Sequence, residues 1–228
     1  MIMKKVLFFA GLLLAMASCE KDPDFDELSS DLVVYSDYDT EAAFGAYATY
    51  FLPDSILDVA SHEARYWKDE NALSIIGEVE RQMDACGYTR IADPEKKAEA
   101  DLGVQVSYVS QTNHVTTGGY PGYWGGWWDY GFWGPWWGGW YYPYPVTYSY
   151  DTNTLILEMV DLTGADAAQQ AGDAGESHRL PVIWYASAHG YQYGNNRVNM
   201  QLLLDGVSQA FSQSAYLGRT EASNTSAN

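Results

Sequence analysis

Apolar residues recur along the chain with two periods, one typical of strands and the other typical of amphipathic helices. Runs of β-branched and aromatic residues bounded by Gly, Pro and Asp predict strands. Their positions are 32–38, 47–52, 88–92, 100–114, 154–162 and 181–191. Apolar positions spaced by three and four residues predict helices at 69–86 and 196–213, and the first has Asp69 as N-cap and Gly87 as closing glycine.

Each predicted helix has one apolar face. In the first helix this stripe consists of Leu73, Ile76, Val79, Met83 and Cys86. In the second it consists of Met200, Leu203, Leu204, Val207 and Phe211. Strands that mostly follow one another, interrupted by one helix and closed by another, predict an α+β fold. We expect an antiparallel or mixed sheet of about six strands with two helices packed on one face.

The most unusual segment is residues 118–145, called the aromatic insert below. Of its 28 residues, 14 are aromatic, nine are Gly, four are Pro and one, Asp129, is charged. Seven of the nine tryptophans lie in it, namely Trp124, Trp127, Trp128, Trp133, Trp136, Trp137 and Trp140. Pro and Gly disfavour a helix, and flexible linkers are poor in aromatic residues. We therefore expect a long aromatic hairpin or loop, with these seven tryptophans as candidate binding residues.

Three roles for the insert are compatible with its composition. The rings can stack on one another and cover the sheet, because aromatic pairs add about 0.5–1.5 kcal/mol beyond area burial. They can form a surface that binds glycan or an envelope protein, since exposed aromatic patches mark partner sites. They can also rest in the headgroup layer of a membrane, where Trp and Tyr partition favourably. The composition does not choose among the three.

The N-terminus has the features of a lipoprotein signal peptide. A basic start, an apolar run from Val6 to Ala17 and small residues before Cys19 predict a signal at residues 1–18 that is too short for a membrane span. The stretch from Leu14 to Cys19 resembles a bacterial lipobox, so Cys19 is the predicted lipidation site. The remaining chain divides into an acidic tether (19–31), a single domain that contains the insert (32–217) and a frayed tail (218–228).

The charge limits the possible partners. The chain has 12 basic and 30 acidic residues, a net charge of −18, which becomes 10 − 30 = −20 when Lys4 and Lys5 leave with the signal. Because a protein this acidic repels polyanions, nucleic acid is not an expected partner. The expected partners are the membrane, through the lipid anchor, and a glycan or envelope protein. After acylation of Cys19, Cys86 is the only remaining thiol, and its apolar helical surroundings predict a buried, inert group.

No catalytic or metal-binding constellation is visible in the sequence. The segment His62-Glu63-Ala64-Arg65-Tyr66 has Tyr where a zinc-protease helix needs its second His. The acids Asp161, Asp166, Asp173 and Glu176 do not have the spacing of an EF-hand loop. We therefore expect a non-enzymatic protein with no cofactor, no metal and no catalytic residues. The alternative is a hydrolase of an envelope polymer with two carboxylates beside the rings, since such a pair has no sequence signature.

Several short motifs occur in an order that resembles one known family. They are Tyr47 to Tyr50 (YATY), Gly87-Tyr88, Ala100 to Val104 (ADLGV), the aromatic insert, Thr154 to Asp161 (TLILEMVD) and Ile183 to Ala188 (IWYASA). Together with the signal peptide and the C-terminal helix, they resemble the envelope lipoproteins of the domain-of-unknown-function 4136 family, over about residues 32–211. The resemblance implies an α+β domain in a bacterial envelope and supplies no catalytic residues.

These features predict a lipid-anchored protein of the outer membrane of a Gram-negative bacterium, facing the periplasm or the cell surface. Its Trp- and Tyr-rich loop is expected to bind glycan, protein or a membrane surface. The alternatives are a structural lipoprotein, in which the loop is only internal packing, and the hydrolase.

Overall fold

The computed structural model describes residues 32–58, 65–109, 130–133, 140–145, 153–163, 180–190 and 196–218. The chain divides into two compact units, Met1–Ser30 and Asp31–Asn228, and every described residue belongs to the second. Its described strands are β1 (Val33–Tyr38), β2 (Thr49–Phe51), β3 (Ile56–Asp58), β4 (Arg65–Trp67), β5 (Thr89–Arg90), β6 (Leu102–Val109), β7 (Trp140–Tyr141), β8 (Thr154–Asp161) and β9 (Leu180–His189). Its described helices are α3 (Glu70–Ala85), α4 (Tyr130–Trp133) and α6 (Asn196–Ser212), with short 3-10 helices η3 (Phe44–Ala46), η4 (Pro94–Glu99) and η5 (Ala215–Leu217).

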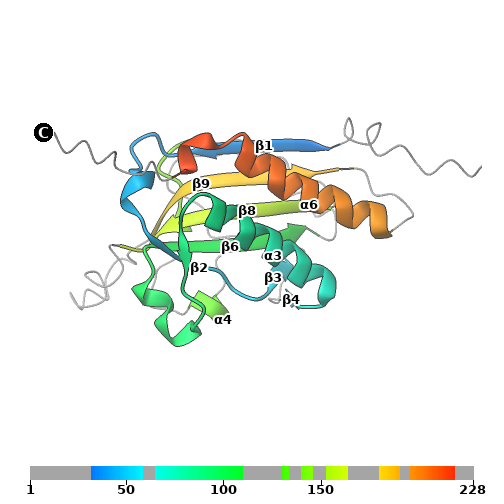
Figure 1. Cartoon of the computed structure of the whole chain (residues 1–228), viewed down its shortest axis with the longest axis horizontal. Helices are drawn as coiled ribbons and strands as arrows, with labels where there is room; N and C mark the ends of the chain where they lie inside the picture. Colours follow the sequence, from blue (N-terminus) through cyan, green and yellow to red (C-terminus); the bar gives the residue numbers. More distant parts are fainter. Residues whose placement is uncertain are drawn as a thin grey trace, which may run out of the picture. The chain divides into compact units, whose positions relative to one another are not determined.

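The strands form a mixed sheet whose main path runs β1-β9-β8-β6-β2-β5 (Figure 1). Strands β1, β9, β8 and β6 are antiparallel neighbours, whereas β2 lies parallel to both β6 and β5. Three short strands lie off this path, because β3 and β4 form an antiparallel pair and β7 pairs with β9. The predicted α+β class and mixed sheet are confirmed.

One edge of β6 is shared by two short strands. β2 pairs with it at Leu102 and Gly103, and β3 pairs with it further along, at Ser107 and Tyr108. Between the two the chain leaves the sheet at Pro53, which has no amide hydrogen to donate to a neighbouring strand. This break between β2 and β3 forms one wall of the cleft described below.

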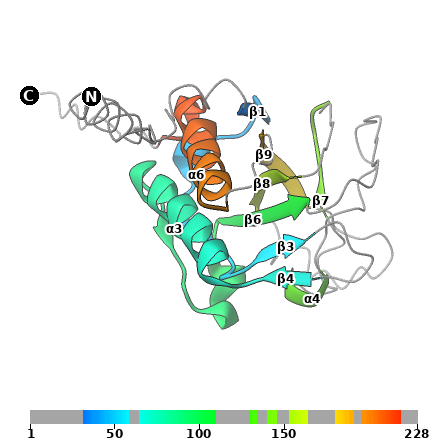
Figure 2. The same cartoon turned by 90° about the vertical axis from the view of Figure 1, so that its right-hand side faces the viewer.

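Helices α3 and α6 cover one face of the sheet, and α4 and β7 lie on the opposite side (Figure 2). The Asp69 carboxylate caps α3 by accepting hydrogen bonds from the amides of Asn71 and Ala72, each 3.0 Å long. Gly87 follows the helix with a φ of 90°, a conformation that a residue without Cβ adopts at little cost. Both predicted end signals of this helix, and the packing of two helices on one face, are therefore confirmed.

The buried stripe of α3 differs in part from the predicted one. The buried residues are Ala72, Ile75, Ile76, Val79 and Met83. Leu73, which was expected in the stripe, is 49% exposed. Successive side chains point about 100° apart around a helix axis. Because Ala72 and Ile75 face the core, Leu73 points toward solvent. Cys86 is half-buried, and burial raises the pKa of its thiol, which disfavours the reactive thiolate.

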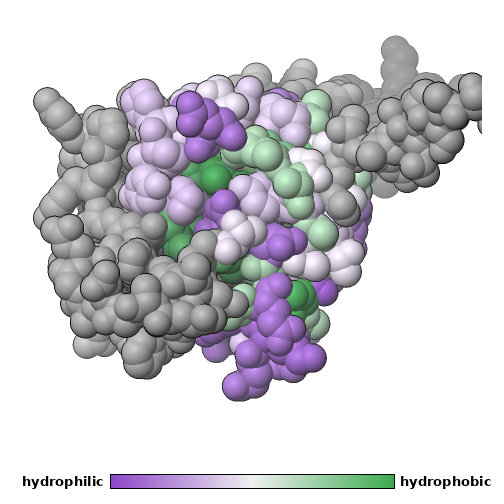
Figure 3. Space-filling model, turned by 90° about the vertical axis from the view of Figure 1, so that its left-hand side faces the viewer, coloured by the Kyte–Doolittle hydropathy of each residue, from purple (hydrophilic) through white to green (hydrophobic). Residues whose placement is uncertain are grey.

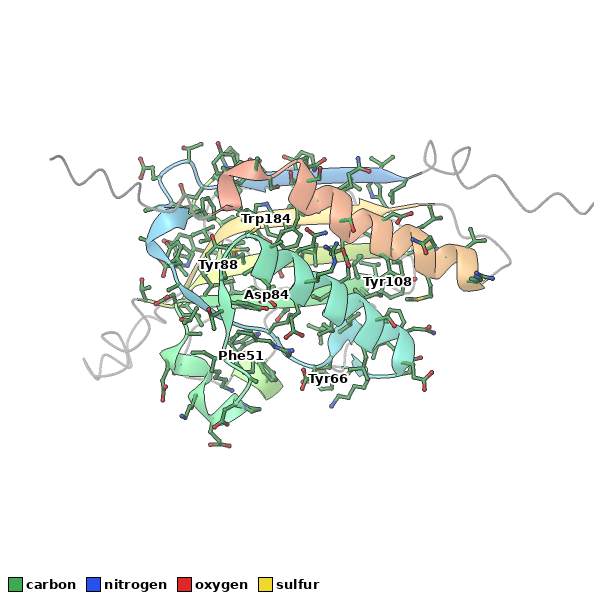
Figure 4. The ribbon with its side chains drawn as sticks, viewed as in Figure 1. Phe51, Tyr66, Asp84, Tyr88, Tyr108 and Trp184 are labelled. Atoms are coloured by element: carbon green, nitrogen blue, oxygen red, sulfur yellow. The ribbon has the colours of Figure 1, made fainter. Side chains whose placement is uncertain are left out.

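The C-terminal helix packs through Val207 and Phe211, both buried against the sheet. Trp184 of β9 is fully buried beneath this helix (Figure 4), with its ring 5.1 Å from that of Phe211. The Trp184 indole N–H donates to Ser214 Oγ at 3.0 Å. The Tyr88 hydroxyl donates to the carbonyl oxygen of Leu217 at 2.8 Å. These buried hydrogen bonds tie the end of the domain to the sheet and to the segment that follows α3.

Some predicted elements are shorter or lie outside the described residues. The strand expected at 47–52 is shorter, since β2 covers only Thr49–Phe51. The β3–β4 pair was not predicted, because three-residue strands carry too little hydrophobic pattern. The predicted signal peptide, the tether and most of the tail lie outside the described residues. No helix in the described part of the chain is long and apolar enough to cross a bilayer.

Candidate functional site

The sheet face opposite the two long helices carries polar side chains on its central strands. Gln105 and Ser107 come from β6, Glu158 from β8 and Ser187 from β9. All four are buried, with exposed fractions of 1% to 6%. A buried polar group costs free energy unless it is hydrogen-bonded, so this face requires a cover that supplies partners.

Two pieces of the aromatic insert, residues 130–133 and 140–145, provide that cover. Trp133 and Trp140 are only 2% and 3% exposed, and their ring centroids lie 5.6 Å apart in an edge-on arrangement. Trp133 also meets the ring of Phe51 on β2 at 6.1 Å. The missing side chain of Gly103 leaves room for the Trp133 indole, because a Cβ atom at this position would lie 2.9 Å from an indole carbon. The described part of the insert is therefore a second hydrophobic core.

The insert also contacts the polar side chains directly. The Trp133 indole N–H donates to Gln105 Oε1 at 2.9 Å, and Gln105 Nε2 donates to Ser107 Oγ at 3.1 Å. The Tyr142 hydroxyl donates to Oε1 of Glu158. Insert and sheet are therefore complementary in polarity as well as in shape, which fixes residues 130–133 and 140–145 in one place.

Glu158 is an acid of this face whose pKa is strongly shifted. Burial raises the pKa of its carboxyl from 4.5 to about 7, and the hydrogen bond from Tyr142 opposes only part of that rise. Its Oε2 is buried and has no hydrogen-bond partner among the described residues. The neighbouring Tyr144 hydroxyl is also buried, and burial raises its pKa. The ionisation of Glu158 is thus coupled to the environment that the insert creates.

A cleft of about 420 Å³ opens where the break between β2 and β3 meets the insert. Its lining consists of Phe51, Leu52, Pro53, Asp54, Ser55, Tyr66, Lys68, Ala92, Pro94 and Phe132. Phe51 and Tyr66, from β2 and β4, lie along the lower side of the sheet in Figure 4. The volume is typical of ligand pockets, which span about 300–1,000 Å³.

The cleft combines aromatic and charged side chains. Tyr66 is 37% exposed, and Lys68 Nζ lies 5.1 Å from the centroid of its ring. The Asp54 side chain is 77% exposed and accepts a hydrogen bond from Arg90 at 2.5 Å. Arg90 also binds Glu80 at 2.8 Å, which connects the cleft wall to α3. Among the described lining residues the charges are one acid and one base.

Within the described ranges, exposed apolar surface outside the cleft is limited. The coloured part of the face in Figure 3 mixes hydrophilic and hydrophobic residues, with the most hydrophilic ones at its lower end. The large hydrophobic residues exposed in the described part of the chain are Val33, Tyr35, Tyr66 and Leu73. Of these, Tyr66 is the residue that lines the cleft.

The seven predicted binding tryptophans fall into two groups. Trp133 and Trp140 are buried and pack in the second core, so these two rings present no exposed face. The other five, namely Trp124, Trp127, Trp128, Trp136 and Trp137, lie outside the described residues, as does the predicted lipidation site Cys19. Sequence reasoning missed the buried polar face and the cleft. The signal for the buried face was the regular spacing of Gln105 and Ser107 in a strand whose partner has a lone Glu158.

No group of three or more potential metal ligands occurs among the described residues. The acid Asp161, considered as a calcium ligand, accepts hydrogen bonds from the Tyr47 hydroxyl at 3.0 Å and the Thr163 amide at 2.8 Å. Asp166, Asp173 and Glu176 lie outside the described residues, as do His62, Glu63 and Ala64 of the zinc-like segment.

The chain was compared with known proteins. Residues 34–214 match the family described as domain of unknown function (DUF4136). A crystal structure of a DUF4136 family protein from Bacteroides thetaiotaomicron VPI-5482 is similar, with 40% identity, a TM-score of 0.68, and coverage of 83% of this chain and 99% of that chain. No curated protein matched.

Two other solved structures are much less similar. A PelC dodecamer from Paraburkholderia phytofirmans has 12% identity and a TM-score of 0.37, covering 79% of this chain and 96% of that chain. A PDZ domain protein from Parabacteroides distasonis ATCC 8503 has 11% identity and a TM-score of 0.35, covering 81% and 36% respectively. Since the family match spans most of the sequence and the Bacteroides relative is 40% identical over nearly its whole length, the chain belongs to the DUF4136 family.

Proposed function

We propose that this chain is a lipid-anchored, non-enzymatic protein of the outer membrane of a Gram-negative bacterium, facing the periplasm or the cell surface, and that its aromatic insert binds envelope glycan. The N-terminal signal and the lipobox-like stretch that ends at Cys19 support the anchor. One acyl chain binds a membrane only marginally, whereas the several chains of a bacterial lipoprotein anchor it stably.

The observation that carries the binding role is the way in which the insert is attached. Trp133 and Trp140 are buried on the sheet, so the insert is held to the domain at two places. The same insert contains five further indoles, at 124, 127, 128, 136 and 137. In this proposal the first pair anchors the segment and the other five bind the glycan, since aromatic faces are strong contact surfaces at binding sites.

The cleft supports a binding role rather than hydrolysis. Glycoside hydrolysis usually requires a pair of carboxyl groups on either side of the scissile bond. Among the described residues that line the cleft, Asp54 is the one acid, and it pairs with Arg90. Glu158 is 1% exposed beneath the insert and is not among the lining residues.

The competing function is structural, with the whole insert serving as internal packing. The burial of Trp133 and Trp140 favours it for those two residues. Replacing the five remaining tryptophans with Ala separates the two functions. In the binding role, retention of the full chain on isolated cell-wall glycan falls at least about tenfold while the melting temperature is unchanged. A matched variant with Tyr at the same five positions keeps the rings and should retain most of the binding.

A large drop in melting temperature together with unchanged retention would support internal packing and refute the binding role. Retention on a protein fraction of the envelope, and not on glycan, would refute the choice of partner. The anchor has its own test, metabolic labelling with a radioactive fatty acid. The wild type should incorporate label and enter the membrane fraction, whereas Cys19→Ala should do neither. Equal labelling of both would refute lipidation at this residue.

A further inference from the structure

The cleft between β2, β4, η4 and the insert brings together an aromatic ring, a hydrogen-bond acceptor and a hydrogen-bond donor. The ring is that of Tyr66, which is 37% exposed. The acceptor is the carboxylate of Asp54, 77% exposed, and the donor is the ammonium of Lys68. None of the tryptophans named as candidate binding residues is among the lining residues.

We infer that this cleft is a binding site for a short stretch of uncharged glycan, with one sugar ring against Tyr66 and hydroxyl groups bonded to Asp54 and Lys68. The site presupposes the envelope location proposed above, and it gives the glycan a defined place on the domain.

The charges of the cleft favour an uncharged, hydroxyl-rich ligand. The lining has one acid and one base, so it offers no surplus of positive or negative charge to a charged ligand. A hydroxyl group can both donate and accept, so a sugar can satisfy Asp54 and Lys68 at once. An apolar peptide would cover the Lys68 ammonium without accepting a hydrogen bond from it, which costs free energy. The net charge of −18 further disfavours a polyanion.

The walls of the cleft are held in place by contacts that do not require a ligand. Arg90 binds Asp54, the carboxylate of Glu80 and the carbonyl oxygen of Leu52, the last two at 2.8 Å. Where the insert lines the cleft, the Lys97 ammonium lies 4.8 Å from the centroid of Phe132 and donates to its carbonyl oxygen. A site that is already ordered loses less entropy when a ligand binds.

Calorimetric titration of the full chain in detergent tests the inference. The probes are three neutral trisaccharides, cellotriose, maltotriose and triacetylchitotriose, with trigalacturonate as the anionic comparison. At least one neutral probe should bind, and Tyr66→Ala should weaken its affinity by a factor of about ten or more. Lys68→Met and Asp54→Asn should each weaken it several-fold, because each removes a charge-assisted hydrogen bond.

Tyr35→Ala is the matched control. Tyr35 is 40% exposed, close to the 37% of Tyr66, but lies on β1 at the other end of the sheet. Its replacement should leave affinity within about twofold of wild type. The inference is overturned if no neutral probe binds, if trigalacturonate binds more tightly, or if Tyr66→Ala and Lys68→Met bind as the wild type does. Circular dichroism of each variant identifies a loss of folding.

The cleft and the insert can fail separately. Retention of the full chain on cell-wall glycan that survives Tyr66→Ala and Lys68→Met refutes the cleft and leaves the proposed function intact. Trisaccharide binding that persists in the chain with five tryptophans replaced, together with unchanged retention on cell-wall glycan, refutes the insert as the binding segment and leaves the cleft intact.

Discussion

Protonation of Glu158 should change the stability of the domain through the face that the insert covers. The carboxyl is 1% exposed and accepts a hydrogen bond from Tyr142. Burial raises its pKa from 4.5 to about 7. A carboxyl with a raised pKa in the folded state binds its proton more tightly there than in the unfolded chain, so folding is favoured where it is protonated.

The sign and size of the effect follow from these two values. The stabilisation is fully present below about pH 4.5, declines as the pH rises, and is lost once the pH passes about 7. Each tenfold change in proton affinity corresponds to about 1.4 kcal/mol, so the interval from 4.5 to about 7 amounts to about 3 kcal/mol.

The assay is urea unfolding of the wild type and of Glu158→Gln at several pH values between 4 and 8. Gln is neutral and nearly isosteric, and its Oε1 can still accept from Tyr142. Comparing the two proteins at each pH cancels the titration of the other acids. We expect equal stability near pH 4, and a variant that is more stable than the wild type by up to about 3 kcal/mol near pH 8.

Glu78→Gln, measured in the same way with the pH range extended down to 2, is the control with the opposite sign. Hydrogen bonds led by Arg81 lower the pKa of Glu78 to about 2, so its contribution is present above pH 4.5 and is lost as the pH falls toward 2. A difference between wild type and Glu158→Gln that stays constant from pH 4 to pH 8 would refute the proposed coupling of charge and burial at this face.

Four other substitutions test the packing, each by the free energy of unfolding in urea. Trp133→Ala should cost about 3–5 kcal/mol, because it removes a buried indole and its bond to the sheet; a cost below 1 kcal/mol would contradict the second core. Gly103→Ala should cost about 1–3 kcal/mol, since its Cβ would lie 2.9 Å from Trp133. Gly77→Ala, in an open position on α3, should instead stabilise by up to about 1 kcal/mol; equal effects of the two would remove the steric explanation. Tyr88→Phe should cost about 1–2 kcal/mol, as it deprives the carbonyl of Leu217 of its donor; an unchanged midpoint would mean that this buried bond contributes nothing.

The sequence by itself determined the elements in which apolar residues follow a regular spacing over many neighbouring positions. The strands β1, β6, β8 and β9 and the helices α3 and α6 lie where alternation or helical spacing predicted them. Asp69 and Gly87 identified both ends of α3, because cap chemistry depends on neighbouring residues only. The family could be recognised in part for the same reason, since three of its motifs, at 100–104, 154–161 and 183–188, lie in or overlap β6, β8 and β9.

Only the tertiary structure decided which surfaces are buried. Trp133 and Trp140 were expected to be binding residues, and the spacing of Gln105 and Ser107 in β6 could not show what covers them. Both assignments depend on the insert folding back over the second face of the sheet, a contact between segments more than twenty residues apart. The cleft likewise needs Tyr66, Asp54 and Phe132 from three separate segments. Periodicity reports which side chains share a face of one element, whereas burial depends on which other element covers that face.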